Sequence, residues 1–398
     1  MAAMEENEYR RRETMLPISR PSLGDDEVSA VREVIESGWL ATGAKCREFE
    51  AKVAAASGVA HGVAFMNATD GLFLTLKAAG VGAGDEVIVP SMTFCATANT
   101  VVHCGATPVF ADIDRTTLNI DPADARRRIT GRTKAIVPVH FAGAPCDMDE
   151  FRALAGEHGL FMMADAAHAL GALYKGRPVA QCADASVYSF HPMKNITTAE
   201  GGMLVTDDAG LAERVRRLRF HGIAQEAWQR EKGEAPARVA LEPGYKSNMP
   251  DLLAALGLVQ MERLEENNAR RRALGELYRA KLAAAAIPGV EVPAGPSSEH
   301  VHAWHLMTAL VDFPGLGADR EEFIRSMAAE NVSLGVHYIA VHLHPYYRET
   351  YPDVPGTLPE TEYVSERTVT LPLYPDMADD DVDSVVAALA RIIDGLRS

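Results

Sequence analysis

Segments of strand pattern alternate with segments of helix pattern from the first quarter of the chain to about Gly222, and this alternation constrains the fold most strongly. The strand candidates are short apolar runs, and helical patterns such as 70–79 and 148–158 lie between them. Strands that alternate with helices in this way are typical of parallel sheets covered by helices. The sequence therefore predicts an α/β domain with a mainly parallel sheet. The predicted strands are 86–90, 107–111, 134–140, 160–164 and 185–190.

The sequence changes character after the first 250 residues or so. Residues 249–285 have the pattern of a long helix, in which Asn248 is placed to cap the first turn and Pro250 stands at an early position that tolerates proline. The later segments are shorter and richer in Pro and Gly, and a final helix is predicted over 379–396. This pattern predicts a second, smaller α+β domain. The expected divisions are a flexible N-terminal extension over 1–14, a large domain over 15–265 and a small C-terminal domain over 266–398, with the long helix bridging the two domains.

The composition excludes several classes of protein. A chain of 398 residues that is 47% hydrophobic buries a large core, but no apolar stretch approaches the roughly 20 residues of a membrane span. Residues 1–14 are rich in Glu and Arg and have no apolar centre, so we expect neither a signal peptide nor an anchor and predict a cytoplasmic protein. The five cysteines lack paired ligand spacing, which favours reduced thiols over disulfides or a zinc site.

The net charge of −16 disfavours nucleic acid as a partner. A small anionic substrate would be repelled by the same overall field. Such a substrate therefore needs a local group of positive side chains or a helix N-terminus to bind it.

A lysine stands between two predicted strands. Lys194 follows the apolar run 185–190 and precedes a second apolar run over 201–206. Most lysines stay on the surface, because burial of the charged amine loses solvation free energy. On position alone Lys194 also fits a solvated loop, so its role depends on the residues around it.

Three further features of the same domain point to one cofactor. Asp165 ends a strongly apolar strand, where a carboxylate needs a cationic partner such as the protonated ring nitrogen of pyridoxal phosphate. Residues 66–71 open a helix with small polar side chains, and the free N–H groups there suit a phosphate. Phe94 follows the predicted strand 86–90 and is placed to stack on a planar ring. Taken singly, these features equally fit helix caps or core packing.

Together with the lysine, these features supply every part of a pyridoxal phosphate site. In chain order they provide a phosphate cradle, a stacking ring, a carboxylate for the ring nitrogen and, in Lys194, an amine able to form a Schiff base. Ser189 adds a hydroxyl that is able to bind phosphate. The sequence therefore predicts an enzyme in which Lys194 carries the cofactor.

From about Pro17 to its end, the chain resembles the DegT/StrS family of sugar-nucleotide aminotransferases. The motifs that carry the resemblance are highly specific when taken together, and they include Asp-Ala-Ala-His over 165–168 and the lysine stretch over 189–202. The resemblance implies the fold type I architecture of pyridoxal phosphate enzymes. That architecture is an α/β fold in which a large domain has a mainly parallel mixed sheet flanked by helices and a smaller C-terminal domain is α+β. The other matching motifs lie at 19–24, 37–43, 84–90, 133–140, 244–251, 302–305 and 336–339.

The resemblance assigns a role to each site residue by position. It implies that Lys194 holds the cofactor and moves the proton, that Asp165 pairs with the ring nitrogen, and that His168 lies beside the phenolic oxygen. The other residues that it places at the cofactor are Phe94 and Ala167 on the two faces of the ring, with Ala68, Thr69 and Ser189 at the phosphate.

The resemblance also implies a homodimer with shared active sites, because Asn248 would reach the phosphate of the cofactor in the neighbouring subunit. Substrate contacts are less specific, and the basic ones among them also fit surface ion pairs. The residues expected at the substrate are His191, Arg20, Lys246, His337 and Tyr338.

The implied activity is transfer of an amino group from L-glutamate to a keto sugar nucleotide. The cofactor alternates between pyridoxal phosphate and pyridoxamine phosphate in a ping-pong mechanism. Members that act at carbon 4 of the sugar have His three residues before the lysine and Ile-Thr after it, whereas members that act at carbon 3 have Tyr and Leu-Gly. Since this chain has His191 and Ile-Thr at those places, it resembles the carbon-4 enzymes, including the aminoarabinose type. Action at carbon 3 remains the alternative.

Two departures from the family pattern affect different parts of the site. Many relatives have Ser-Gly-Thr where this chain has Asn-Ala-Thr over 67–69, a change that keeps the backbone donors and the Thr hydroxyl. Many relatives have Gln where Ala144 stands, which leaves the sugar contacts open. The nucleotide, the sugar and the destination of the product are not assigned by the sequence.

Two other classes of function remain. A sugar dehydratase on the same scaffold has His in place of the lysine, and the presence of Lys194 opposes it. A regulatory protein has no need of a complete cofactor site. The His- and Tyr-rich stretch 337–348 fits a sugar pocket better than a metal site, because acidic or Cys partners at ligand spacing are missing. We interpret His302, Trp304 and His305 as packing residues.

Overall fold

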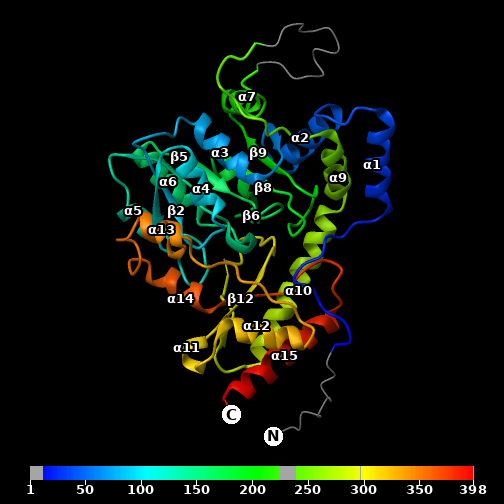
Figure 1. Ribbon diagram of the computed structural model, residues 1–398, viewed down its shortest axis with the longest axis vertical. Helices are drawn as coiled ribbons and strands as arrows, with labels where there is room; N and C mark the ends of the chain where they lie inside the picture. Colours follow the sequence, from blue (N-terminus) through cyan, green and yellow to red (C-terminus); the bar gives the residue numbers. More distant parts are fainter. Residues whose placement is uncertain (1–11, 224–238, 296, 398) are drawn as a thin grey trace.

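A seven-stranded sheet forms the centre of the large domain in the computed structural model, which describes residues 12–223, 239–295 and 297–397 (Figure 1). The strand order is β1-β9-β8-β5-β4-β2-β3. Neighbouring strands pair in parallel except at β9, which runs antiparallel to both β1 and β8. The predicted mainly parallel α/β sheet is therefore confirmed. The strands are β1 (His61–Phe65), β2 (Glu86–Pro90), β3 (Thr107–Ala111), β4 (Thr133–Ile136), β5 (Phe161–Asp165), β8 (Ala185–Ser189) and β9 (Gly202–Thr206).

The predicted strands coincide closely with those in the sheet, with two differences. The strand expected over 134–140 ends at Ile136, because Pro138 has no N–H to continue the ladder of hydrogen bonds. Strand β1 was not predicted, because it is short and contains Gly62. The Gly62 position has no room for a side chain, since a Cβ there would lie 2.5 Å from the carbonyl oxygen of Glu50.

Helices cover both faces of the sheet, and alternate residues of each strand point to opposite helix layers. Ile88 and Ile136 pack in one cluster, with helices α2 (Ala44–Ala56), α6 (Met148–His158) and α9 (Asp251–Glu262). Val87, Val89 and Val137 pack in the other. The helices of that second layer are α3 (Ala68–Ala78), α4 (Ala96–His103) and α7 (Ala209–Leu218).

The C-terminal part is a smaller α+β domain with its own core, as the sequence predicted. Its antiparallel sheet has the order β10-β11-β12 and packs against helices α10, α12 and α15. Leu16 belongs to the same core, so the chain enters the large domain only after contacting the small one. These elements are β10 (Val290–Glu291), β11 (Met307–Val311), β12 (Thr368–Leu371), α10 (Leu264–Ala285), α12 (Arg320–Ala329) and α15 (Asp379–Arg397).

The remaining elements lie around the two cores. The helices are α1 (Asp25–Ser37), α5 (Pro122–Arg127), α11 (Phe313–Leu316), α13 (Pro345–Thr350) and α14 (Pro359–Arg367), and a small hairpin pairs β6 (Leu173–Tyr174) with β7 (Arg177–Pro178). Within the described ranges, every helix is too short or too polar to cross a membrane. Most of the predicted N-terminal extension, residues 1–11, lies outside those ranges. Its described part contacts the small domain, since Arg12 forms an ion pair with Asp381.

The long helix predicted over 249–285 is two helices. The backbone leaves helical geometry at Arg263, where φ is −103° and ψ is 5°, and this residue separates α9 from α10. The prediction that Asn248 caps the segment was wrong, because α9 begins at Asp251 with Pro250 at the cap position. The Asn248 side chain instead contacts Thr42 and Lys246.

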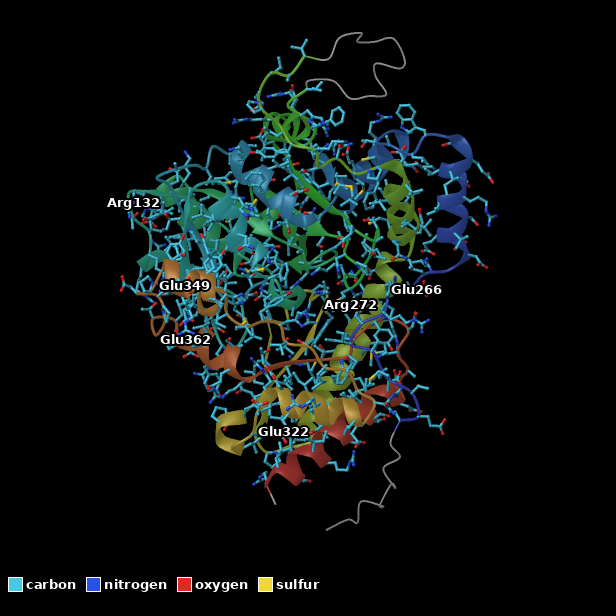
Figure 2. All side chains as sticks on the ribbon, in the orientation of Figure 1. Arg132, Glu266, Arg272, Glu322, Glu349 and Glu362 are labelled. Carbon is cyan, nitrogen blue, oxygen red and sulfur yellow. The ribbon has the colours of Figure 1, made fainter. Side chains whose placement is uncertain are left out.

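Charged side chains lie mainly on the periphery of both domains. The labelled Arg132, Glu266, Glu322 and Glu349 are exposed, and they lie on the outer surface in Figure 2. Acidic residues outnumber basic ones, 55 to 39, so this surface is acidic overall.

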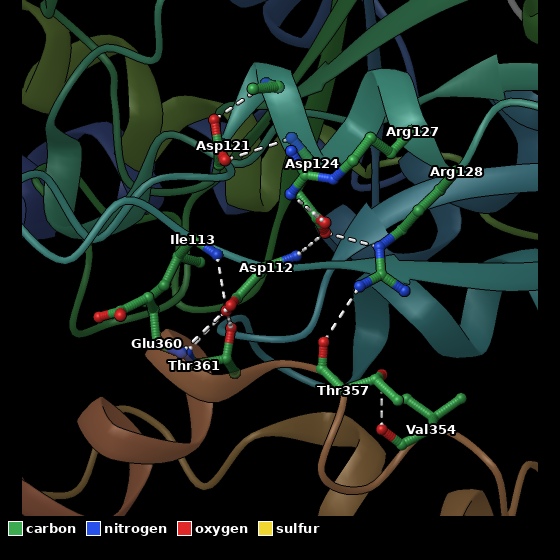
Figure 3. A network of polar contacts seen from close by, with 11 residues as sticks. Asp112, Ile113, Asp121, Asp124, Arg127, Arg128, Val354, Thr357, Glu360 and Thr361 are labelled. Carbon is green, nitrogen blue, oxygen red and sulfur yellow. Dashed lines mark hydrogen bonds and ion pairs between the residues drawn. The ribbon is translucent and has the colours of Figure 1, made fainter.

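A buried pair of aspartates attaches helix α14 to the large domain (Figure 3). Asp112, which follows β3, accepts hydrogen bonds from the backbone N–H groups of Thr361 and Glu360 at 2.7 and 3.1 Å. Asp124 accepts the N–H of Asp112 at 2.7 Å and the guanidinium of Arg128 at 2.6 Å. The first turn of α14 thereby obtains its N-terminal cap from a distant strand.

We expect Asp124→Asn to destabilise the fold by about 2 kcal/mol at neutral pH, because a buried charge-assisted hydrogen-bond network is lost. Burial alone raises the pKa of Asp124, but hydrogen bonds from Arg128, from the Asp112 N–H and from Arg127 outweigh it and lower the pKa. A lowered folded-state pKa stabilises the fold above the unfolded-state pKa of about 3.9, and this contribution is lost as pH falls through the folded-state pKa.

The measurement is the free energy of unfolding in urea from about pH 7 to about pH 3. The wild type should lose stability toward acid more steeply than Asp124→Asn. Substitution of the exposed Asp394 by Asn serves as the control and should leave the slope unchanged. Equal slopes for the wild type and Asp124→Asn would contradict the prediction.

Candidate functional site

A cavity of about 370 Å³ lies at the carboxyl-terminal ends of the parallel strands. Ligands bind at this edge in open α/β sheets, because loops from several strands converge there. Asp165 is the last residue of β5 and Ser189 the last of β8, while Phe94 follows β2. The cavity brings together eleven residues that the sequence placed at the cofactor or substrate. They are Ala68, Thr69, Phe94, Asp165, Ala167, His168, Ser189, His191, Lys194, His337 and Tyr338.

Helix α3 presents its N-terminus to the cavity. Asn67 caps it by accepting the Asp70 N–H on Oδ1 at 2.8 Å. Ala68 and Thr69 occupy the first two helical positions, where backbone N–H groups have no partner within the helix. The positive end of the helix dipole and these N–H groups favour an anion such as a phosphate.

The close approach of this helix to β9 requires glycine. A Cβ added at Gly202 would lie 2.5 Å from the Ala68 nitrogen and 2.6 Å from its Cα, which is closer than any real contact. The glycine pair that follows the lysine stretch therefore has a packing role, since Gly202 lets the helix terminus reach the cavity.

Asp165 is buried, and both of its hydrogen-bond donors are neutral. Thr97 Oγ1 donates at 2.8 Å and the Ala167 N–H at 3.1 Å. Burial raises the pKa of Asp165, although these two donors and the nearby Lys194 oppose the rise. A carboxylate in this environment gains free energy from a cation placed at the cavity wall.

Lys194 lies in a closed loop between β8 and β9. Backbone hydrogen bonds from Phe190 N–H to Gly201 oxygen and from Thr198 N–H to Phe190 oxygen, at 2.9 and 3.0 Å, join the two ends of this loop. Burial lowers the pKa of Lys194 to about 8, while the nearby Asp165 opposes the change. A pKa of about 8 leaves roughly a tenth of the lysine as free amine at pH 7, far more than for an exposed lysine.

Two aromatic groups border the lysine and the aspartate. Tyr338 contacts His168 Nε2 through its hydroxyl at 3.1 Å, and the two rings are nearly parallel. Phe94 is 56% exposed, so its ring is available to a bound molecule rather than taken up in the core. Tyr338 and Phe94 lie with ring centroids 6.0 Å apart.

His305 also lines the cavity, and the sequence-based interpretation of it as a packing residue was incomplete. Its side chain is buried, and Nε2 lies 3.3 Å from Lys194 Nζ. In the sequence, only the motif 302–305 marked His305 as a residue of interest. Its contact with Lys194 could not be predicted, because the two residues lie more than a hundred positions apart.

Three residues predicted at the site lie outside this cavity. Arg20 and Lys246 are exposed and do not line it. Asn248 is also absent from the lining and contacts Thr42 and Lys246 instead. Asn248 was expected at the cofactor of the neighbouring subunit, so its place outside the cavity of its own chain leaves that expectation a prediction. The substrate contacts expected for Arg20 and Lys246 also stay predictions.

The residues that line the cavity fit the cofactor that the resemblance implies. The α3 N-terminus suits its phosphate, and a Cβ at position 202 would displace the backbone of Asn67 and Ala68 from that place. Asp165 has neutral donors only, which suits a cationic ring nitrogen. His168 has a buried Nδ1 without a hydrogen-bond partner among the described residues, so it has capacity for a further polar contact. The described ranges contain no group of three or more His, Cys, Asp or Glu residues that could hold a metal ion.

Comparisons with known proteins agree with this chemistry. The sequence model of the DegT/DnrJ/EryC1/StrS aminotransferase family matches residues 21–390. The spore coat polysaccharide biosynthesis protein SpsC of Bacillus subtilis (strain 168) is 46% identical over 388 residues, which cover 97% of this chain and 99% of SpsC.

Two solved structures show the same fold over nearly the whole chain. DesI, crystallised in the presence of its TDP-sugar product, is 36% identical with a TM-score of 0.84, and the match covers 97% of this chain and 95% of DesI. Spr1654 of Streptococcus pneumoniae, solved in its PLP form, is 30% identical with a TM-score of 0.88, and the match covers 96% of this chain and 100% of Spr1654.

We predict that Gly202→Ala weakens binding of pyridoxal phosphate by about tenfold or more, because the new methyl group displaces the α3 N-terminus. The measurement is fluorescence or absorbance titration of the apoprotein with the cofactor. Gly156→Ala in helix α6 is the matched control, since a Cβ there meets nothing within 4 Å. Equal affinities for the two variants would show that the close approach has no part in binding.

Proposed function

The chain belongs to the DegT/DnrJ/EryC1/StrS aminotransferase family, and on this basis we propose that it transfers an amino group from L-glutamate to the 4-keto carbon of a nucleotide-linked sugar, with pyridoxal phosphate as cofactor. Sugar aminotransferase activity is the coarser function that the family and its structural relatives support. The observation that carries the proposal is one cavity that holds the Lys194 amine, the Asp165 carboxylate and the N-terminus of helix α3.

The proposal gives the cofactor a set of partners in this cavity. When bound, pyridoxal phosphate supplies an electron sink through its protonated ring nitrogen. Asp165 keeps that nitrogen protonated, because the negative charge of a buried carboxylate favours a cation beside it. Thr97 and the Ala167 N–H fix the orientation of the carboxylate. The remaining contacts are the N–H groups of Ala68 and Thr69 with the Ser189 hydroxyl at the phosphate, and Phe94 and Ala167 at the ring faces.

Lys194 moves the protons of both half-reactions. In the first, its free amine takes the α-proton of glutamate, and a lowered pKa gives it the unprotonated form that a base requires. The ammonium group that forms would then pass this proton to the bound cofactor, which leaves the amine free again. In the second half-reaction the amine would take a proton back from the cofactor side and deliver it to the carbon of the sugar that keeps the amino group.

The proposed substrate class rests on two observations. DesI, a structural relative, was crystallised with its TDP-sugar product, which supports a nucleotide-linked sugar here. His191 lines the mouth of the cavity as an exposed residue and carries the sequence signature of carbon-4 action. A carbon-3 enzyme has Tyr at this place, so we propose carbon 4.

We also propose that two chains form a homodimer in which Asn248 and Lys246 complete the site of the partner. The two side chains hydrogen-bond to each other outside the cavity of their own chain. In a dimer they would add polar contacts to a cavity whose cationic side chain is Lys194. Sedimentation analysis of the wild type and measurement of cofactor affinity in Asn248→Ala test this arrangement. A monomeric active enzyme would exclude it.

Lys194→Ala should abolish the visible absorption band of bound cofactor and lower turnover by at least about a thousandfold. Lys194→Arg keeps the positive charge but cannot form the Schiff base, so it should behave in the same way. Absorbance after addition of pyridoxal phosphate and an aminotransfer assay are the two measurements. Normal turnover in either variant would eliminate Lys194 as the reactive amine.

Asp165→Asn should lower turnover by about a hundredfold, because a neutral amide no longer holds the ring nitrogen protonated. Cofactor should still attach to Lys194, so the absorption band persists and separates this effect from misfolding. The exposed substitution Asp394→Asn is the control and should leave turnover unchanged. Unaltered turnover in Asp165→Asn would refute its proposed role.

A panel of 4-keto and 3-keto sugar nucleotides, each offered with glutamate, tests the substrate. Mass spectrometry should detect an aminated 4-keto sugar and 2-oxoglutarate as products. Amination of 3-keto sugars alone would overturn the choice of carbon 4 while leaving the aminotransferase function intact. If glutamate fails and another amino acid reacts, only the proposed donor is wrong.

A further inference from the structure

His305 reaches the reactive lysine from the other end of the chain. It lies between strands β10 and β11, and its Nε2 is 3.3 Å from Lys194 Nζ. Its ring also packs on His168, with ring centroids 4.3 Å apart. Neither the resemblance nor the proposed function gives this contact a role.

The backbone around His305 is held in place by buried contacts. The His305 N–H donates to the Ala142 oxygen at 2.8 Å. The buried Arg271 donates to the carbonyl oxygens of Trp304, His305 and Leu373. Trp304 has a left-handed backbone, with φ at +48°, which is unfavourable for a residue with a side chain.

The indole of Trp304 fits only because its neighbour on α10 is glycine. A Cβ at Gly275 would lie 2.4 Å from the indole ring. The strained tryptophan, the buried arginine and this glycine together fix the point at which His305 enters the cavity. A contact maintained by so many constraints is a defined feature of the site rather than incidental packing.

The surroundings of His305 keep its ring neutral. Burial, as the largest cause, lowers the pKa of His305 well below its usual value, and Lys194, His168, Arg271 and His337 lower it further. These groups face it from the lysine loop, from the turn after β5, from α10 and from the segment after α12. All of them are basic, so a second positive charge on His305 is disfavoured.

The position of the ring proton follows from the two nitrogens. Nδ1 is buried and has no hydrogen-bond partner in the described part of the chain. A proton there would be an unpartnered buried donor, which is less favourable than an unpartnered lone pair. Beside a free amine, the neutral ring therefore carries its proton on Nε2, the nitrogen that faces Lys194. A lysine that accepts this hydrogen bond must be a free amine.

We propose that His305 is a positioning residue whose Nε2–H donates to Lys194 Nζ when that lysine is a free amine, and that this hydrogen bond orients the free amine and favours it over the ammonium form. The inference rests on the proposed function, because it gives Lys194 the role of proton carrier. It adds a residue that sets the protonation state of that carrier.

The test measures the pKa of Lys194 in the full-length apoprotein. The rate at which fluorodinitrobenzene modifies Lys194 is followed as a function of pH, by mass spectrometry of the peptide that contains it. His305→Phe keeps an aromatic ring but removes the donor, so the pKa should rise by about one unit, which is a tenfold loss of free amine below the pKa. The more apolar phenyl ring by itself would lower the pKa of Lys194, because it disfavours the ammonium form. A rise in this pKa therefore reports the loss of the hydrogen bond from His305.

A second variant and a control make the result specific. His305→Gln keeps an N–H donor of similar reach and should restore a pKa close to that of the wild type. His300→Phe changes a histidine of the same segment that packs on Tyr174 instead, and it should have no effect. The pH dependence of turnover in the holoenzyme should shift in parallel with the labelling.

The other outcomes overturn the inference. An unchanged pKa in both His305→Phe and His305→Gln shows that the contact has no influence on the amine. A lowered pKa in His305→Phe also contradicts the inference, because loss of a hydrogen bond donated to the free amine must raise the pKa of Lys194. If the wild type neither binds pyridoxal phosphate nor transfers an amino group, the proposed function fails, and the labelling result still reports the contact independently.

Discussion

The site depends on the burial of a lysine amine and an aspartate carboxylate in one cavity. Each group alone loses solvation free energy there, and the loss shows in the lowered pKa of Lys194 and the raised pKa of Asp165. Both pKa shifts increase the fraction of each side chain that is uncharged at neutral pH. A bound cation at Asp165 restores its charge, whereas Lys194 keeps a population of free amine. One environment would thus suit both the proton carrier proposed for Lys194 and a cationic cofactor ring held by Asp165.

The architecture explains how these groups meet. Parallel strands end at one edge of the sheet, so Asp165 and Ser189 are delivered to the same place by β5 and β8. The antiparallel strand β9 returns the lysine loop to the sheet, and its Gly202 admits the N-terminus of α3. The small domain then closes the cavity with side chains such as His305 and Tyr338.

Much of the fold and of the candidate site followed from sequence pattern. The strands 86–90 and 107–111 and the helix 148–158 were predicted at their observed bounds, because buried parallel strands are continuous apolar runs and the helix has clear caps. Strand β1 and the break at Arg263 were missed. A five-residue strand with a glycine has little pattern, and a single non-helical residue between two apolar helices leaves the periodicity intact.

The sequence by itself determined the α/β class, and it pointed to Lys194, Asp165 and the start of helix α3 as candidates for one site. These features are local, since each depends on a strand end or a helix start within a few residues. Only the tertiary structure decided that His305 touches Lys194, that Gly202 is needed for close approach, and that Asn248 lies outside the cavity of its own chain. Contacts between distant segments depend on how the two domains pack, and no periodicity or spacing in the sequence records that packing.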